Sequence, residues 1–316
     1  MAYSAGDTIL DDEYNAFVNN SSSPFGYNHF AGPGSGEYGL NQSTIATVSA
    51  GDTINASHWN SLFTGMDNIA NHTNTSITAS SVSAGDTIAI RSALITDLAS
   101  LASAVAAGST GATALSTNSI GTSTNSGTWN STSTIERSVT FANNNTMRAF
   151  FNAGGKIRVD PAISGSTTGS KDTVFSELTA AVGNLDIGAH ASTRSGSGET
   201  QTTFNSSTGF HDLGTGYSTI LKLTSNNSGY TSDNIEIYAK LDAAVSSATV
   251  ITIKLVSRDP ADDTTYTSPN TSGVPANPNE APKMQLNIIE EFPTADEGLA
   301  SAIQSSSNAQ VSNSAS

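Results

Sequence analysis

The sequence predicts an α+β protein, in which a short N-terminal helical module is joined by a linker to a mostly antiparallel β-sandwich with one helix. Two patterns predict this class. Apolar residues recur every three or four positions before residue 107, and apolar and polar residues alternate between residues 135 and 292. The predicted parts are the helical module at 1–107, a linker rich in Ser, Thr, Gly and Asn at 108–134, the sandwich at 135–292 and an unstructured polar tail at 293–316.

The helical module is marked by a hexapeptide, Ser-Ala-Gly-Asp-Thr-Ile, that occurs at residues 4–9, 49–54 and 83–88. Each copy precedes a stretch with helical spacing of its apolar residues. Gly and Asp favour a turn, so we interpret the hexapeptide as a lead-in to a helix. After the first two copies, Tyr14-Asn15 and Trp59-Asn60 stand at the same distance from the repeat glycine.

The apolar stripes of these three helices are expected to be too large for one chain to cover. Short helices are marginal alone, and copies of the chain would complete the core in a symmetric homo-oligomer. The predicted assembly residues are Tyr14, Phe17, Trp59, Leu62, Phe63, Met66, Ile69, Leu94, Leu98 and Leu101.

The loop between the first two helices is rich in glycine and in aromatic residues, namely Phe25, Tyr27, Phe30 and Tyr38. One interpretation is a contact loop for a partner. The other, which we favour, is local packing over the helices, because glycines let the rings fold inward.

Six segments of the predicted sandwich alternate apolar and polar residues, as half-buried strands do. They lie around Val139 to Phe141, Ile157 to Val159, Ile220 to Leu223, Ile235 to Leu241, Ile251 to Leu255 and Met284 to Ile288. A helix is expected near residues 171–185, and a proline-rich excursion separates the last two strands at 259–282. Trp129 is expected to mark the point where the linker docks onto the sandwich.

Residues 138–159, with the sequence SVTFANNNTMRAFFNAGGKIRV, predict a strand, a short helix, a tight corner and a second strand. Phe150 and Phe151 are expected to anchor the corner in the core, and Gly154 and Gly155 to permit the reversal. This block resembles the FFNAGG block of virion structural proteins from marine tailed phages, in particular contractile-tailed cyanophages. The similarity extends over most of residues 1–292. It implies a virion component and supplies no catalytic residues.

The composition disfavours several classes of partner. The chain has 12 Lys and Arg against 27 Asp and Glu, a net charge of −15 and no cysteine. Phosphate-binding surfaces need basic residues, so we expect no nucleic-acid partner and no binding to anionic membranes. No apolar run reaches the ~18 residues of a membrane span. The N-terminus lacks the basic and apolar regions of a signal peptide, which predicts synthesis in the host cytoplasm.

The sequence shows no pattern of a catalytic, cofactor or metal site. None of the five histidines forms a close ligand pair, and His58 and His72, at the ends of a predicted helix, are interpreted as capping or packing residues. Asp259, Asp262 and Asp263 suit either a solvated acidic loop, which we favour, or calcium. Glu290 and Glu291 are expected on opposite faces of a strand, so they form no acid–base pair.

The sequence therefore predicts a non-enzymatic structural subunit of a tailed phage virion, with copies of itself and other virion proteins as partners. A tail, neck or baseplate appendage of fibre-like type is the first location, and capsid decoration or a head fibre is the alternative. A second alternative is a carbohydrate-binding sandwich that recognises host surface glycans through Tyr217, Tyr230, Tyr238 and Tyr266. A depolymerase would need a pair of acidic residues in a cleft, and the sequence shows no sign of one.

Overall fold

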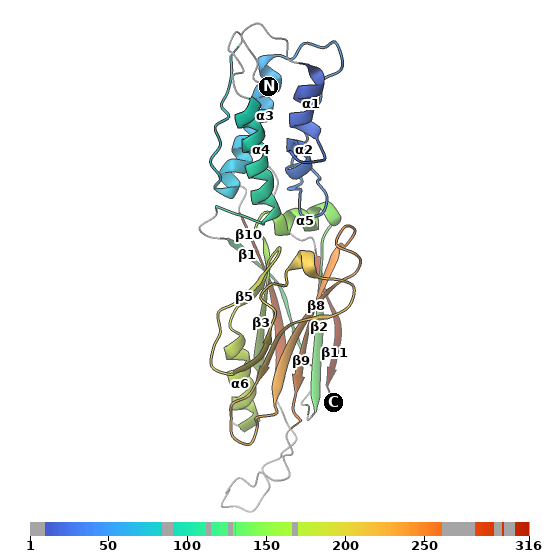
Figure 1. The fold of residues 1–316 in the computed structure, drawn as a ribbon. Coiled ribbons are helices and arrows are strands. Elements are labelled where there is room, and N and C mark those ends of the chain that lie inside the picture. The colour runs from blue at the N-terminus through green and yellow to red at the C-terminus, as the bar shows by residue number, and fades with distance from the viewer. Residues whose placement is uncertain are drawn as a thin grey trace, which may run out of the picture. The chain divides into compact units, whose positions relative to one another are not determined.

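The chain folds into two compact units that together form an α+β protein with a β-sandwich (Figure 1). The computed structural model describes residues 10–83, 91–111, 115–125, 129, 131–165, 170–260, 282–293, 299 and 307–315. The helical unit comprises residues 1–116, 142–155 and 291–305, and the sandwich unit comprises residues 117–141, 156–290 and 306–316. The α+β class with a β-sandwich is thus as predicted from the sequence.

Most described aromatic residues of the helical unit are buried, and Phe25 and Tyr38 are half-buried. The helices in the described part of this unit are α1 (Asp11–Asn19), α2 (Tyr27–Phe30), α3 (Ala56–Thr73), α4 (Arg91–Ala106) and α5 (Asn144–Asn152). In the aromatic loop Tyr27 and Phe30 are buried, and the ring of Phe25 stacks on that of His29 at 4.4 Å. The loop therefore packs over its own helices, which was the favoured interpretation.

The second hexapeptide is a helix lead-in, as predicted. Asp52 accepts a hydrogen bond from the backbone N–H of Ser49 at 3.0 Å, and Gly51 has a φ of 91°, which favours glycine at the turn. Asn55 then caps α3, because its side chain accepts from the N–H groups of Ser57 and His58. The first copy, and all but Ser83 of the third, lie outside the described residues.

The two asparagines at matching repeat positions hold the chain just before a hexapeptide. Asn15 donates to the carbonyl of Val48 at 2.8 Å and accepts from its N–H at 2.9 Å. Asn60 makes the same pair of bonds with Val82, at 2.9 and 2.8 Å. Each helix thus binds the extended segment that leads into the following copy, and a side-chain amide takes the place of a neighbouring strand.

We expect Asn60→Ala to lower the free energy of unfolding of the helical unit by about 1–3 kcal/mol, because both backbone groups of Val82 lose their partner. Urea unfolding followed by Trp59 fluorescence would measure this. Asn71→Ala is the matched control, since Asn71 is exposed on the same helix and bonds only to Asp67. Equal effects of the two variants would contradict the role assigned to Asn60.

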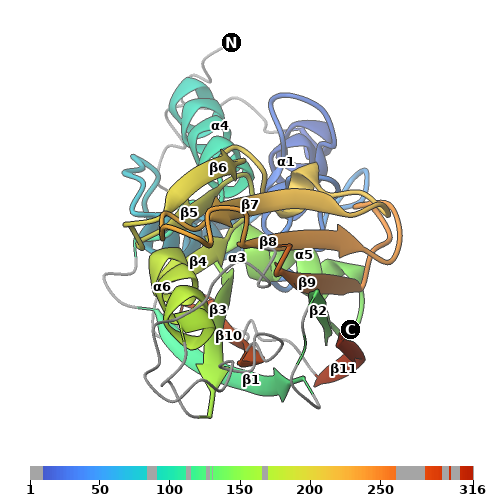
Figure 2. The same ribbon diagram turned by 90° about the horizontal axis from the view of Figure 1, so that it is seen from below.

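The sandwich unit consists of two sheets that face each other (Figure 2). One has the order β1-β10-β3-β4-β5 and the other β11-β2-β9-β8-β7-β6. The strands are β1 (Ser116–Thr124), β2 (Thr132–Thr140), β3 (Lys156–Ser164), β4 (Leu185–Ile187), β5 (Ser192–Arg194), β6 (Thr200–Phe204), β7 (Ser218–Thr224), β8 (Asn234–Leu241), β9 (Val250–Arg258), β10 (Lys283–Phe292) and β11 (Ser307–Ala315). A short 3-10 helix, η1 (Phe210–Asp212), precedes β7.

The core of the sandwich follows the predicted alternation. On β8 and β9 the odd-numbered residues from Ile235 to Leu241 and from Ile251 to Leu255 are almost fully buried. The predicted helix is α6 (Ser170–Val182), which packs against β3, β7 and β8. Trp129 docks as expected, since its indole N–H donates to the carbonyl of Pro282 at 2.7 Å and its ring packs against Phe175.

Two predicted boundaries need correction. The linker expected at 108–134 contains β1 and the start of β2, and the tail expected at 293–316 contains β11, which pairs antiparallel with β2. Both strands are rich in Ser, Thr and Asn, so neither shows apolar alternation. The edge strand β1 is hydrogen-bonded to β10 in the sheet, and side-chain bonds from Gln285 to Thr124 and from Asn118 to Glu290 add to this pairing.

A third correction concerns residues 142–155, which were expected inside the sandwich. This segment, which includes α5, belongs to the helical unit. The chain leaves the sandwich after Phe141 and returns to it at Lys156.

Candidate functional site: the outer face of the six-stranded sheet

The predicted assembly residues are covered within a single chain. All ten, from Tyr14 to Leu101, are less than a tenth exposed, and Trp59 is 2% exposed with its ring against those of Tyr14 and Phe63. Residues outside the three stripes, among them Leu40 and Tyr27, are buried in the same unit. The predicted reason for self-association, an uncovered apolar stripe, is therefore wrong.

The FFNAGG block forms a structural corner in the helical unit. Phe150 and Phe151 have no exposed surface, and their rings meet edge to face at 5.0 Å. Gly154 has a φ of 86°, and a Cβ on Gly155 would lie 2.4 Å from the carbonyl oxygen of Phe150. All four residues thus have the structural role that the sequence predicted.

Polar residues of the same block tie α5 to the aromatic loop. The guanidinium group of Arg148 donates to the carbonyl of Pro33 at 2.8 Å, and Asn152 donates to that of Gly39 at 3.1 Å. Both side chains are at most 4% exposed. The residues of this block therefore stabilise the fold, and their polar groups are not available to bind a substrate.

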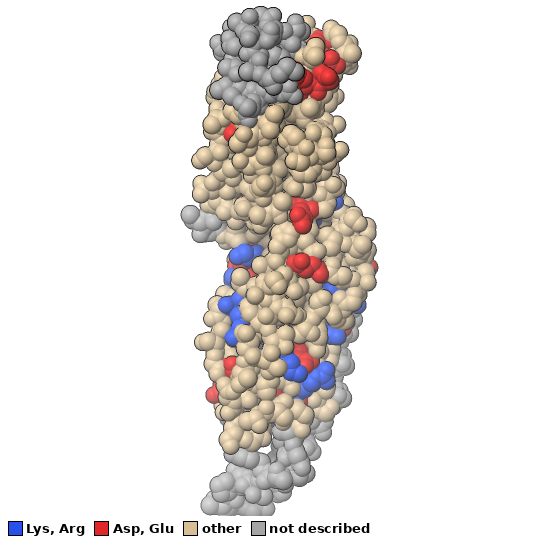
Figure 3. Space-filling model, viewed as in Figure 1, with Lys and Arg blue, Asp and Glu red and all other residues tan. Residues whose placement is uncertain are grey.

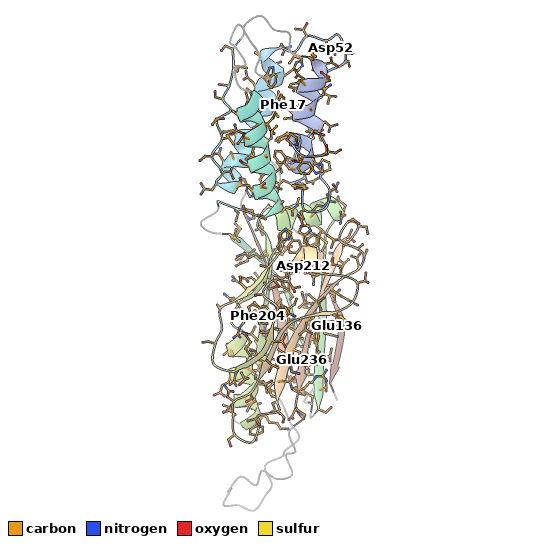
Figure 4. The ribbon with its side chains drawn as sticks, in the orientation of Figure 1. Phe17, Asp52, Glu136, Phe204, Asp212 and Glu236 are labelled. Atoms are coloured by element: carbon orange, nitrogen blue, oxygen red, sulfur yellow. The ribbon has the colours of Figure 1, made fainter. Side chains whose placement is uncertain are left out.

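The outer face of the six-stranded sheet carries a cluster of charged and tyrosine side chains, which we call the outer-face cluster. It consists of Glu136, Tyr217, Lys222, Glu236, Tyr238, Lys240, Lys254 and Arg258 (Figure 4 labels Glu136 and Glu236). The strand alternation puts these side chains opposite the core. The ladder aligns Glu136, Lys254 and Tyr238 in one row across β2, β9 and β8.

Two lysines of the cluster lie over tyrosine rings. The Lys254 ammonium is 3.7 Å from the centre of the Tyr217 ring and 4.7 Å from that of Tyr238. Lys240 is 4.5 Å from the Tyr217 ring. Such cation–π contacts attract an ammonium group to the face of a ring. The two lysines are therefore held on this face by tyrosine rings.

Glu236 organises the other half of the cluster. It accepts hydrogen bonds from Lys222 at 2.6 Å and from the Tyr238 hydroxyl at 2.5 Å, and Arg258 lies 3.3 Å away. Burial alone would raise the pKa of Glu236, but the bonds from Lys222 and Tyr238 and the Arg258 charge outweigh it, so this pKa is lowered. Burial and then Glu136 raise the pKa of Tyr217, so its hydroxyl stays protonated.

The cluster has an excess of positive charge, since four basic residues accompany Glu136 and Glu236. Both units are nevertheless acidic as a whole. The helical unit has twelve acidic and two basic residues, and the sandwich unit, with the cluster included, has fifteen acidic and ten basic residues, which gives net charges of −10 and −5. Figure 3 shows Asp and Glu gathered at one end of the helical unit, while the basic side chains in this view lie mostly over the sandwich. The first turn of α1 contributes Asp11, Asp12 and Glu13 to the acidic end.

The tyrosines proposed for glycan binding do not form a flat platform. The rings of Tyr217 and Tyr238 are inclined at 70°, and ammonium groups lie over them. Tyr230 is buried, and Tyr266 lies outside the described residues. Sugar rings stack on open aromatic faces, so these residues give the glycan alternative little support.

The remaining candidate residues do not converge on a metal or a substrate. The structure brings His190 and His211 together, which the sequence did not predict, and their rings stack at 4.7 Å. A metal lies in the plane of each histidine that binds it, and two stacked rings share no such point. Among the described residues no group of three or more His, Cys, Asp or Glu could hold a metal, and no helix is long and apolar enough to cross a membrane.

Asp259, one of the three residues considered for calcium, is buried beside Lys171, and Asp262 and Asp263 lie outside the described residues.

A scan against protein-family models found no match, and searches of curated proteins and of solved structures found none either.

Proposed function

We propose that this chain is a non-enzymatic structural subunit of a tailed phage virion, located in a tail, neck or baseplate appendage. The observation that carries the proposal is the structural role of the FFNAGG block, the part of the sequence that resembles virion proteins. Its phenylalanines are fully buried, and Arg148 and Asn152 bond to backbone carbonyls of the aromatic loop. A block whose residues all serve the fold suits a protein whose task is to hold a shape.

The outer-face cluster supports assembly between copies of the chain. Its excess positive charge complements the acidic end of the helical unit, where α1 begins with Asp11, Asp12 and Glu13. A contact between different surfaces of two copies is heterologous, and such contacts build rings or extended arrays. Charge complementarity of this kind sets orientation and association rate more than affinity.

We expect the double variant Lys240→Glu/Lys254→Glu to weaken self-association of the full chain about tenfold, which corresponds to about 1.4 kcal/mol. The wild-type contact should weaken with added salt. Sedimentation velocity over a range of protein concentrations would measure both effects. Lys283→Glu is the matched control, because Lys283 is an exposed lysine on the other sheet. Equal association of all three proteins would contradict a contact through the outer-face cluster.

The location in the particle is testable with antibodies against the purified chain. Electron microscopy of labelled tailed phage particles should show the label on the tail, neck or baseplate, and gradient-purified particles should retain the chain. Label on the head would favour the decoration or head-fibre alternative. Absence of the chain from purified particles would overturn the proposal.

A further inference from the structure

A buried ion pair joins α6 to the end of β9 in the sandwich unit. The ammonium group of Lys171, in the first turn of α6, contacts carboxylate oxygen Oδ2 of Asp259, the residue that follows β9. The two side chains are 7% and 0% exposed. Water therefore has little access to this pair. The Lys222–Glu236 pair differs, because its lysine side chain is 32% exposed.

A second buried carboxyl group lies next to the end of the same ladder. Asn234 of β8 and Arg258 of β9 form the last pair of this antiparallel ladder, and Asp233 and Asp259 are the residues that adjoin that pair. Asp233 and Asp259 are 0% and 3% exposed, and both continue the core-facing alternation of Ile235 and Ser257.

Buried aromatic residues lie near Lys171 on α6, and a backbone hydrogen bond fixes the end of β9. Phe175, one turn after Lys171 on α6, is fully buried and packs against Trp129 at 4.9 Å. The backbone N–H of Asp259 donates to the carbonyl of Ser131 at 2.9 Å, which holds the end of β9 in place. Proton transfer from the ammonium group to the carboxylate within this pair would give a neutral amine and a neutral carboxylic acid, and burial disfavours charged forms in general.

We propose that Lys171 and Asp259 react to form an intramolecular amide bond, with Asp233 as the group that moves the proton. The Lys171 amine attacks Cγ of the protonated Asp259 carboxyl group, so a bond from Nζ to Cγ forms and a bond from Cγ to a hydroxyl oxygen breaks. Asp233 takes a proton from Nζ and delivers it to the leaving oxygen. The ion pair becomes one amide and one water molecule, and no oxidant or other reactant is required.

The bond would close a covalent loop from α6 to the end of β9 across the sandwich. The chain has no cysteine, so disulfides cannot supply such a link. A cross-link that closes a long loop restricts the unfolded chain and raises stability. This inference does not depend on the virion function, because it concerns only residues of the sandwich unit.

The mass of the intact, purified full-length chain tests the proposal directly. We expect it to be lower than the mass of the sequence by one water molecule, and tandem mass spectrometry of a protease digest should find one branched peptide that joins Lys171 to Asp259. Localisation of the lost water to another site, such as a succinimide at a surface aspartate, would overturn the proposal. So would the full mass in freshly purified and in long-incubated folded protein.

Variants separate the reaction from the fold. Lys171→Arg should have the full mass and a lower melting temperature, and Asp259→Asn should lose ammonia in place of water if the same attack occurs. Asp233→Asn should fold, as judged by circular dichroism, but form the link at least tenfold more slowly. Lys222→Arg is the matched control, since its ion pair is open to solvent, and it should keep the link. Normal linking in folded Lys171→Arg would exclude Lys171 as the reacting amine.

Discussion

Replacing both Phe150 and Phe151 with alanine is expected to unfold the helical unit at room temperature. Both rings are fully buried, and truncation of a buried phenylalanine costs about 3–5 kcal/mol. The two losses together are comparable with the whole stability of a typical domain, about 5–15 kcal/mol. Because α5 belongs to the helical unit, the loss should appear there first.

The two tryptophans allow each unit to be followed separately, because Trp59 lies in the helical unit and Trp129 in the sandwich unit. Variants with Trp129→Phe or Trp59→Phe would each leave one reporter. The double alanine variant should lose the folded signal of Trp59. Phe25→Ala is the control, since Phe25 is only half-buried in the same unit, and it should cost much less. Retention of a cooperative Trp59 transition together with loss of partner binding would favour a functional role for the two rings.

The parts of the fold that the sequence predicted are those in which one chain segment carries its own pattern. On β8 and β9 the alternation of apolar and polar residues identifies the strand and its buried face. The strands β1 and β11 have no such alternation, because their edge positions are filled with Ser, Thr and Asn. The positions of β1 and β11 depend on pairing with strands that are distant in the sequence, and a local sequence pattern does not predict such pairing.

The same reason explains the errors at the helical stripes and at α5. The spacing of Trp59 and Phe63 identified an apolar face correctly, but that face is covered within the chain, where the rings of Tyr14 and Phe17 pack against Trp59 and both α2 and α4 contact α3. Phe150 and Phe151 were correctly expected in a core, but the sequence around them does not indicate whether that core belongs to the helical unit or to the sandwich unit. The lysines and tyrosines of the outer-face cluster come from three strands and a loop, so only the folded sheet brings them together.

One signal in the sequence could have predicted more. Asn15 and Asn60 stand at matching positions after their hexapeptides, and each binds the valine just before the next copy. The third helix has Leu94 at this position, so the series of asparagine bonds ends with the second copy. The pair of Lys171 and Asp259 had no comparable signal, because 88 positions separate the two residues.

The second large effect is expected from acidification, through His72 near the end of α3. This side chain is fully buried, and burial lowers its pKa to about 4, although the Ala153 backbone opposes this shift in part. In the unfolded chain the pKa of a histidine is about 6.5. Between these two values the unfolded state binds the proton and the folded state does not. Stability is therefore fully present above about pH 6.5 and is lost as the pH falls towards 4.

A difference of about 2.5 pKa units corresponds to a loss of about 3 kcal/mol at and below pH 4. Urea unfolding of the Trp129→Phe protein, with Trp59 as the reporter, would measure it between neutral pH and pH 4. Carboxyl groups also titrate near the lower end, so the informative quantity is the difference between this protein and the same protein with His72→Leu. That variant should lose the part of the pH dependence between 6.5 and 4 and keep the rest. An Asn71→Ala control, which changes an exposed and non-ionisable side chain on the same helix, should keep it all. An identical pH dependence with and without His72 would show that the buried imidazole is not the group that titrates.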